Sequence, residues 1–292
     1  MQPCKRRVVK KLFFLIVSVC LSGCTKTKAP NQPTQTEAIR SLEERVGELE
    51  KQLGVLSEKA PVWDSVAEGV SEILSKLGNG AGNAKPSEPS AEKVYSVPVG
   101  DDPYIGKKHA LVTIVKAYDF YCGYCDKARP TMDALLKKYP KNLKVVFKEF
   151  VIHPDSAGEP ALAACAAHKE GKFLAMYDRI WKDGIRSRKR LERSDLLDIA
   201  NDLGIKRAKF EKHMDNDCIE EITNDQQELA KLGVRGTPAF FINGRYLVGA
   251  QPTHVFSALI DEELGKAKAL VSSGVKPKDV YDHIMKDAAT SI

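Results

Sequence analysis

The sequence predicts an α/β fold in which a large helical insertion interrupts a sheet flanked by helices, all preceded by an N-terminal helical segment. Three observations support this fold class. A β-branched, apolar run at residues 111–115 leads directly into a helix-forming segment at residues 126–139. Two further strand patterns, at residues 239–242 and 246–248, lie on either side of an Asn-Gly turn. Residues 151–232 carry helical patterns, among them a helix expected at residues 161–181 and one that Ser194 is expected to cap. Removing this block leaves strand–helix–strand followed by strand–strand–helix.

Residues 1–23 are expected to be an export signal. They hold five Lys and Arg residues and no acid, followed by an apolar run too short to span a bilayer. The run ends in Leu-Ser-Gly-Cys, which resembles the lipobox of bacterial lipoproteins. In that class the signal is cut before the cysteine, so Cys24 is the expected lipid attachment site. An uncleaved anchor and an ordinary signal are the alternatives, and Thr25 favours the outer membrane by the same resemblance.

Three segments separate the expected lipid from the folded domain. Residues 24–36 are polar with two prolines and are expected to form a tether. Residues 37–77 are expected to form a helical stalk, either a coiled coil that joins several chains or a single amphipathic helix packed on its own domain. Residues 78–92 are rich in glycine and proline and are expected to form a flexible linker. The stalk begins with a heptad pattern formed by Ile39, Leu42, Val46, Leu49, Leu53 and Leu56.

The folded domain is expected over residues 93–292, and its first motif is Cys-Gly-Tyr-Cys at residues 122–125. Two intervening residues place both sulfurs at the first turn of a helix, where unpaired N–H groups favour a thiolate. The sequence therefore predicts that Cys122 is an exposed thiol with a lowered pKa, the catalytic nucleophile of thiol–disulfide exchange. Cys125 is expected to lie inward and to resolve the mixed disulfide. A Cys-x-x-Cys between a strand and a helix is the thioredoxin-type redox motif.

The Cys-x-x-Cys motif has two alternative roles, a structural disulfide or half of a zinc site, and the other cysteines bear on both. Zinc needs further ligands at comparable spacing, whereas Cys165 and Cys218 are isolated and the histidines are scattered. No metal and no cofactor are therefore expected. Of seven cysteines, two are lost with the signal and one carries lipid, which leaves four. Cys165 and Cys218 are expected to pair in an exported protein, with two buried free thiols as the alternative.

A second stretch, Gly-Thr-Pro at residues 236–238, precedes the strand pattern Ala-Phe-Phe-Ile. With the Cys-x-x-Cys motif and Val-Pro-Val-Gly-Asp-Asp-Pro at residues 97–103, it resembles the DsbA-like family of thioredoxin-fold thiol–disulfide oxidoreductases over about residues 95–264. The resemblance implies that Pro238 is cis beside the two cysteines and that Thr237 presents its backbone to substrate. Taken alone, Pro238 is typical of an ordinary edge strand.

The residues between the cysteines bear on the direction of the chemistry. By resemblance, Cys-Gly-Tyr-Cys with Thr before a cis proline occurs in DsbC-type isomerases, whereas strong DsbA oxidases carry Cys-Pro-His-Cys with Val before the proline. Gly123 and Tyr124 supply no histidine to stabilise a thiolate, so a weaker oxidant is expected. The sequence favours an isomerase or reductase in which Gly123, Tyr124, Thr237 and Pro238 bind substrate. A dithiol oxidase and a redox-inactive scaffold are the alternatives.

Composition and motifs together indicate the partners. The 292 residues carry a net charge of +6, but this falls to +1 without the five basic residues of the signal, so nothing indicates nucleic acid. The expected partners are exported proteins with cysteines, a membrane redox partner, the lipid bilayer through Cys24, and other copies of the chain through the stalk. The expected location is the periplasmic face of the cell envelope. A basic run at residues 186–190 indicates a solvated loop, with an anionic partner as the alternative.

Overall fold

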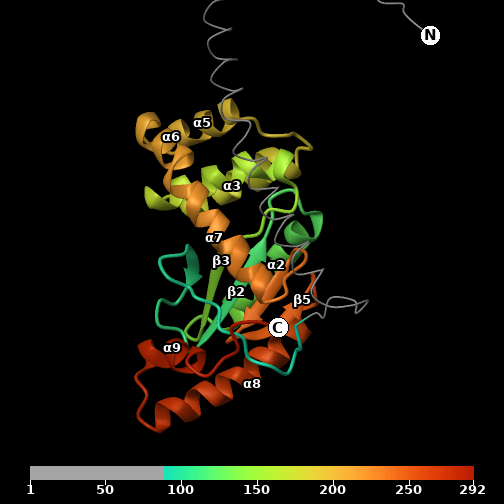
Figure 1. Ribbon diagram of the computed structural model, residues 1–292, viewed down its shortest axis with the longest axis vertical. Helices are drawn as coiled ribbons and strands as arrows, with labels where there is room; N and C mark the ends of the chain where they lie inside the picture. Colours follow the sequence, from blue (N-terminus) through green and yellow to red (C-terminus); the bar gives the residue numbers. More distant parts are fainter. Residues whose placement is uncertain (1–88) are drawn as a thin grey trace, which may run out of the picture. The chain divides into compact units, whose positions relative to one another are not determined.

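The computed structural model describes residues 89–292. The expected signal, tether, stalk and Cys24 lie outside the described residues, as does most of the linker. In the described part, five strands form one sheet in the order β1-β3-β2-β4-β5, in which β2 and β3 are parallel and the other neighbours antiparallel (Figure 1). The strands are β1 (Tyr104–Gly106), β2 (Val112–Tyr118), β3 (Leu143–Glu149), β4 (Ala239–Ile242) and β5 (Arg245–Val248).

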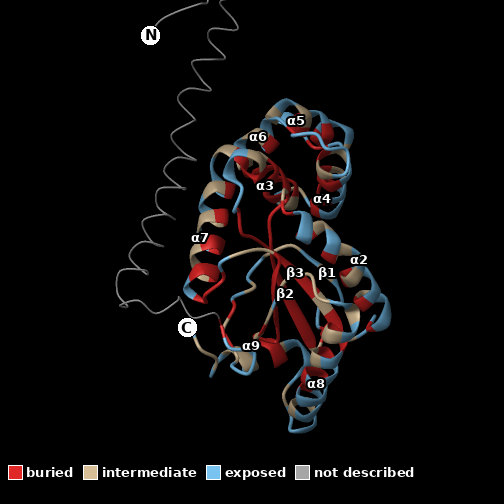
Figure 2. Ribbon diagram, turned by 90° about the vertical axis from the view of Figure 1, so that its right-hand side faces the viewer, coloured by how far each residue is buried: buried red, intermediate tan, exposed pale blue. Residues whose placement is uncertain are grey.

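Alternating residues of the central strands supply a core on each face of the sheet, as the period of two of a strand requires. On one face, Ile114 and Phe240 belong to a large apolar cluster that includes residues of α2 and α8. On the other face, Val115 and Phe241 pack with residues of α7 and α9. Figure 2 shows the buried central strands between these helices. The four helices are α2 (Gly123–Lys138), α7 (Asp217–Lys231), α8 (Thr253–Ser272) and α9 (Val280–Met285).

The chain between β3 and β4 forms the helical insertion. Its first helix contacts the four α-helices that follow it in the insertion, because its buried alanines allow close approach. The insertion lies at one end of the sheet (Figure 1). Its elements before α7 are α3 (Pro154–Lys169), α4 (Phe173–Ile180), the π-helical turn η1 (Trp181–Ile185), α5 (Arg193–Asp202) and α6 (Arg207–Asp215).

Two helix limits in the insertion differ from those expected. Residues 161–181, expected as one helix, belong to α3, α4 and the first residue of η1. Gly171, directly after the cap of α3, adopts a φ of +70°, which glycine tolerates and which ends the helix. Ser194 was expected to cap the next helix, but Glu192 and Asp195 form a capping box at the start of α5.

The hairpin between β4 and β5 confirms the turn predicted at Asn243 and Gly244. Both residues have positive φ, 44° and 85°, as the tight turn requires. The Asn243 amide donates to the Leu111 carbonyl at 3.1 Å and accepts from the Thr113 N–H at 2.9 Å, which ties the turn to β2. A Cβ atom at Gly244 would lie 2.6 Å from the Tyr95 carbonyl oxygen, so a larger residue does not fit without movement.

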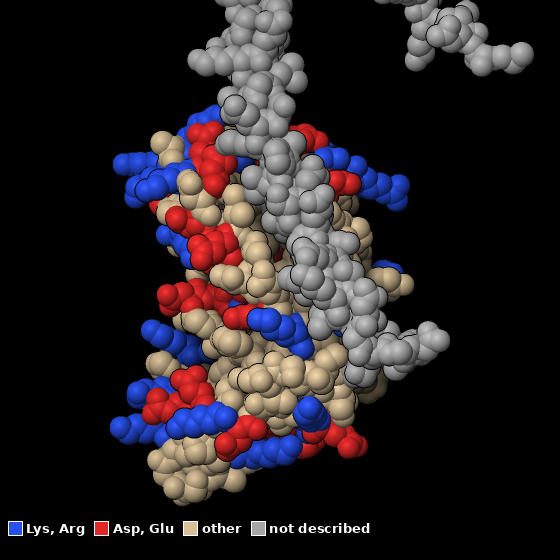
Figure 3. Space-filling model, in the orientation of Figure 1, with Lys and Arg blue, Asp and Glu red and all other residues tan. Residues whose placement is uncertain are grey.

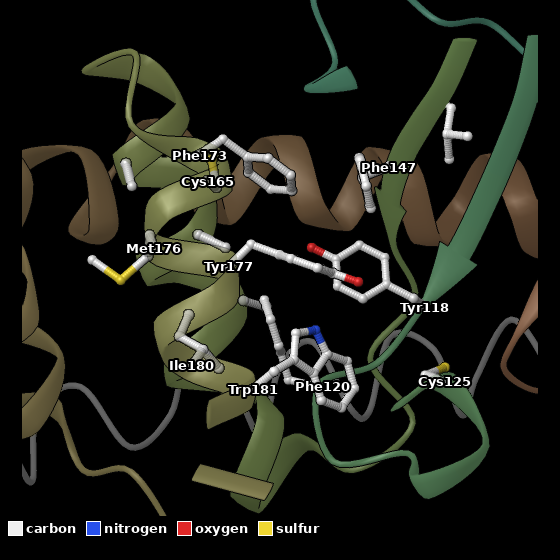
Figure 4. Packing of buried hydrophobic residues seen from close by; sticks show 14 of the residues in the cluster. Tyr118, Phe120, Cys125, Phe147, Cys165, Phe173, Met176, Tyr177, Ile180 and Trp181 are labelled. Carbon is white, nitrogen blue, oxygen red and sulfur yellow. The ribbon is translucent and has the colours of Figure 1, made fainter. Parts of the chain in front are cut away.

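Aromatic side chains join the end of β2 to the insertion (Figure 4). The Phe120 ring lies between Tyr177 and Trp181, with ring centroids 5.5 and 5.4 Å away. The Tyr118 ring lies 5.6 Å from Tyr177 and 5.9 Å from Phe147 of β3. Each such pair contributes about 0.5–1.5 kcal/mol beyond its area burial. The segment that follows β2 is therefore held by the sheet and by the insertion together.

Candidate functional site

The Cys-Gly-Tyr-Cys motif lies where the chain passes from β2 into α2. Cys122 has extended backbone angles and is the N-cap residue of α2, so the helix begins at Gly123, three residues before the expected start at Asp126. The Cys125 N–H donates to the Cys122 carbonyl oxygen at 2.9 Å and closes the first turn. Cys122 therefore lies at a helix N-terminus, where N–H groups without helical partners favour negative charge.

A buried carboxylate, Asp119, fixes the approach to the motif. It accepts hydrogen bonds from the Tyr121 N–H at 2.6 Å and from the N–H groups of Ile152 and His153 at 2.8 and 2.9 Å. The His153 ring nitrogen Nδ1 lies 3.2 Å from the same carboxylate. Because Asp119 is fully buried, these donors are what compensate its loss of water. Asp119 thus ties the motif to the start of the insertion.

Residues far away in the sequence complete the site. The Cys122 sulfur lies 3.2 Å from the carbonyl oxygen of Thr237, 115 positions later in the chain. The peptide bond between Thr237 and Pro238 is cis. The Thr237 hydroxyl is buried and has no hydrogen-bond partner within the described residues, which leaves it free to donate to the Cys122 sulfur. The structure therefore brings Cys122, Cys125, Thr237 and Pro238 together, as expected from the sequence.

The two thiols have opposite acidities. The pKa of Cys122 is lowered to about 5, mainly because the Cys125 thiol donates a hydrogen bond to its thiolate. Burial opposes this shift, whereas the Thr237 side chain and the backbone N–H groups of Cys125 and Tyr124 lower the pKa further. The pKa of Cys125 is raised far above that of an ordinary thiol, mainly by burial and then by the same hydrogen bond to Cys122. At neutral pH one sulfur is a thiolate and the other holds its proton.

The exposure of the motif differs in one respect from expectation. Cys122 was expected to be exposed, but its side chain is only 5% exposed, because the segment carrying Thr237 lies against the sulfur. Gly123 and Tyr124, expected to bind substrate, are exposed, Tyr124 to 63%. The Lys127 ammonium lies 4.9 Å from the centroid of the Tyr124 ring. A substrate therefore meets the residues between the cysteines before it reaches the sulfur.

Lys116 is a further buried group beside the site that the sequence analysis missed. It is fully buried, its ammonium donates to the Tyr177 hydroxyl at 3.0 Å, and three aromatic ring centroids lie 5.4–5.8 Å from it. Its positive charge lowers the pKa of Cys125 and so opposes the effect of burial. The signal for it in the sequence is a lysine within the apolar strand at residues 112–118.

The remaining two cysteines lie in the insertion. A disulfide joins Cys165 of α3 to Cys218 of α7, with the Cα atoms 5.8 Å apart and 53 positions between them in sequence. Cys122 and Cys125 are the free cysteines of the described residues. Among residues 89–292, no group of three or more His, Cys, Asp or Glu side chains is arranged to hold a metal ion. The chemistry open to the site is therefore that of two adjacent thiols, one nucleophilic and one poised behind it.

Comparisons with known proteins identify a family and one curated relative. Residues 113–261 match the family described as DSBA-like thioredoxin domain. The chain is 31% identical over 176 residues to the Na(+)/H(+) antiporter NhaA 3 of Salinispora tropica, a match that covers 59% of this chain and 26% of that protein. The chain therefore spans about a quarter of the length of that curated relative.

Two solved structures share the fold. A thioredoxin-like oxidoreductase from Silicibacter pomeroyi is 24% identical, with a TM-score of 0.50, and the match covers 56% of this chain and 92% of that one. The alpha-DsbA1 protein of Wolbachia pipientis is 20% identical, with a TM-score of 0.51, and the match covers 60% of this chain and 96% of that one. These likenesses concern the fold.

Proposed function

Because the chain belongs to the family of DSBA-like thioredoxin domains, we propose that it is a thiol–disulfide oxidoreductase in which Cys122 is the nucleophile and Cys125 resolves the mixed disulfide. The observation that carries this proposal is the pairing of a Cys122 pKa of about 5 with a raised Cys125 pKa at one helix N-terminus. A thiolate is a good nucleophile and leaving group, and a buried thiol beside it is protected from direct reaction.

The reducing direction proceeds in two exchanges. The Cys122 thiolate attacks one sulfur of a substrate disulfide, and the other substrate sulfur leaves as a thiolate that takes a proton from water. Cys125 then gives up its proton and attacks the Cys122 sulfur, which releases the second substrate thiol and closes the Cys122–Cys125 disulfide. Two electrons pass to the substrate, and oxidation of a substrate dithiol is the reverse. In isomerisation, a second substrate thiol replaces Cys125 in the release step.

Substrate binding is assigned to the surface around the sulfur. Thr237 and Pro238 border the sulfur, because the Thr237 carbonyl oxygen lies 3.2 Å from it. An extended substrate segment can pair with the backbone at Thr237 and lie across Gly123 and Tyr124, which are exposed. The exposed Tyr124 ring then offers apolar contact next to the reacting atoms.

Two directions of redox chemistry remain, and each has an observation in its favour. Cys-Gly-Tyr-Cys with Thr237 before the proline favours an isomerase or reductase, by resemblance to DsbC-type proteins. The Cys122 pKa of about 5 favours a DsbA-type oxidase, because a more stabilised thiolate stabilises the reduced form and makes a stronger oxidant. We favour the isomerase or reductase. A measured reduction potential near that of thioredoxin, about −270 mV, would indicate a reductant.

The proposed setting is the periplasmic face of the cell envelope. The support is the lipobox-like sequence at Cys24 and the resemblance of residues 1–23 to an export signal. None of the helices within residues 89–292 is long and apolar enough to cross a bilayer. The substrates would be exported proteins with cysteines, and a membrane redox partner would restore the active-site cysteines. Thr25 follows Cys24, the proposed lipid attachment site, and by resemblance to bacterial lipoproteins favours the outer membrane.

Self-association through residues 37–77 would suit an isomerase, since several Cys122 sites could then engage one misbonded chain. The test compares a protein of residues 25–292 with one that begins at Glu92. The longer protein is expected to be oligomeric by light scattering and to reactivate scrambled ribonuclease. The shorter one is expected to be monomeric, to keep insulin reduction and to lose reactivation.

Cys122→Ser in the longer protein is the control, and it should abolish both activities. Insulin reduction that survives Cys122→Ser would contradict the proposed chemistry. A longer protein that is monomeric at tens of micromolar, or that oxidises dithiols without reactivating ribonuclease, would favour the oxidase.

A further inference from the structure

The loop at residues 186–192 contacts the residues that flank the active-site motif on each side. The Tyr121 hydroxyl donates to the Lys189 carbonyl oxygen at 3.0 Å and accepts from the Leu191 N–H at 2.8 Å. The Arg186 guanidinium pairs with the Asp126 carboxylate at 3.1 Å. Tyr121 directly precedes the first active-site cysteine and Asp126 directly follows the second. The basic run in this loop therefore lies against residues on either side of the Cys-x-x-Cys motif.

Positive charge is concentrated around the motif. Nine Lys and Arg and three Asp and Glu lie in three segments, residues 121–129, 181–193 and 233–238. The whole of residues 89–292 contains 32 Lys and Arg and 29 Asp and Glu. The acids of other elements that face these segments include Asp178, paired with Arg129, and Asp195, paired with Lys189. Figure 3 shows Lys and Arg side chains projecting over the loop that precedes α5. Outside these three segments the described chain is net negative.

Several of these cations are available to a partner. Within residues 89–292 no ion pair is formed by Lys127, Lys182, Arg188 or Arg235, which we call the basic rim. All four are exposed. Lys127 follows Cys125 by two positions and Arg235 precedes Thr237 by two, so these two residues lie on the two segments that form the site. Lys182 and Arg188 lie on the segment that Arg186 and Lys189 join to the motif.

We propose that the basic rim selects substrate proteins that carry acidic residues within about three positions of the reacting cysteine, since three extended residues span about 10 Å. This inference rests on the proposed function. The Debye length is about 8 Å at physiological ionic strength, so an acid that comes within about that distance of a rim cation is attracted and one farther away is largely screened. Nucleic acid fits less well, because strong binding uses about six to ten phosphate contacts and the basic rim has four cations.

The test uses three peptides, each with one cysteine bonded to a fluorescent thiol and differing only in their flanking residues. The flanks are Glu, Ser or Lys at two positions on each side. The reduced protein is expected to cleave the Glu peptide about tenfold faster than the Lys peptide, the lower end of what electrostatic steering achieves, with the Ser peptide between them. In about 1 M salt, where the Debye length is about 3 Å, the three rates should converge.

The double variant Lys182→Glu, Arg188→Glu reverses two charges of the basic rim and leaves the motif intact. The matched control reverses Lys276 and Lys286, exposed residues beside α9 at the opposite end of the domain (Figure 1). The first variant is expected to lose the preference for the Glu peptide and to cleave the Ser peptide at the wild-type rate. The control is expected to behave as the wild type.

Three outcomes would overturn the inference. Equal wild-type rates on the three peptides overturn it and leave the proposed function standing. If the rim variant keeps the preference for the Glu peptide but no longer sediments with vesicles of anionic phospholipid, the rim binds a membrane surface instead. Failure to cleave any peptide overturns both the inference and the function on which it rests.

Discussion

Replacing Cys125 with alanine should raise the pKa of Cys122, because the Cys125 thiol is the strongest of the groups that lower it. Cys125→Ser is the matched comparison, since a serine hydroxyl at the same position can still donate a hydrogen bond to the sulfur. Both variants lack the resolving thiol, so they differ in the presence of a donor and in little else. The difference between the two pKa values isolates the hydrogen bond.

The size of the effect follows from the strength of that hydrogen bond. A hydrogen bond to a charged group contributes about 1.5–3 kcal/mol. One pKa unit corresponds to about 1.4 kcal/mol, so the Cys122 pKa should rise by about one to two in Cys125→Ala. The remaining donors, the Thr237 side chain and the backbone N–H groups of the helix start, keep it below that of a free thiol. Serine should hold the value closer to about 5.

The assay is the rate of Cys122 alkylation by iodoacetamide as a function of pH, with the product located by mass spectrometry. The midpoint is expected between about pH 6 and 7 in Cys125→Ala, and lower in Cys125→Ser. Identical midpoints in the two variants would refute the reasoning, since the hydrogen bond would then contribute nothing to the acidity.

Three further predictions follow from the same site and from the insertion. Thr237→Val removes a buried hydroxyl and should raise the alkylation midpoint of Cys122 by up to about one pH unit, with no change if that hydroxyl does not reach the sulfur. The folded pKa of Cys122 lies below the unfolded one, so the thiolate stabilises the reduced protein above about pH 5, and this stabilisation is lost as the pH falls through that value. In urea unfolding, the free energy of unfolding of the reduced protein should therefore rise by roughly 2 kcal/mol relative to that of the oxidised protein between about pH 5 and pH 7. A difference between the two forms that does not change with pH would contradict the lowered pKa. Replacing Cys165 and Cys218 together with alanine should lower the free energy of unfolding by about 2–5 kcal/mol while the alkylation midpoint of Cys122 stays unchanged, and a shifted midpoint would mean that the insertion also governs the thiol.

Features encoded in adjacent residues could be predicted from the sequence. The strand before the motif, the Cys-x-x-Cys spacing and the Asn243-Gly244 turn each depend on local backbone preferences, and the structure has all three. The fold class followed, because these elements occur in the order strand–helix–strand, insertion, strand–strand–helix. Resemblance to a known family added the cis bond before Pro238, which local propensity alone does not indicate.

Cysteine counting predicted the Cys165–Cys218 disulfide, but other contacts between distant residues could not be predicted. Cys122 was expected to be exposed, but it is covered by a segment 115 positions away, and no local pattern reveals that contact. Asp119 is buried among N–H donors at the start of the insertion, and the Lys116 ammonium donates to the Tyr177 hydroxyl. Both arrangements depend on partners that lie far away in the sequence. The helix end at Gly171 is a local feature that was also not predicted, because the alanine-rich pattern before this glycine favours an unbroken helix.

The central claim is that Cys122 attacks substrate disulfides and Cys125 resolves the product. The most direct test incubates Cys125→Ser and Cys122→Ser, each in reduced form, with a peptide disulfide at pH 7 and determines the adducts by mass spectrometry. Cys125→Ser should accumulate a mixed disulfide at Cys122, because no second thiol remains to release the peptide. Cys122→Ser should form none, since the pKa of Cys125 is raised and its side chain is fully buried. An adduct on Cys125, or no adduct on Cys122, would contradict the account.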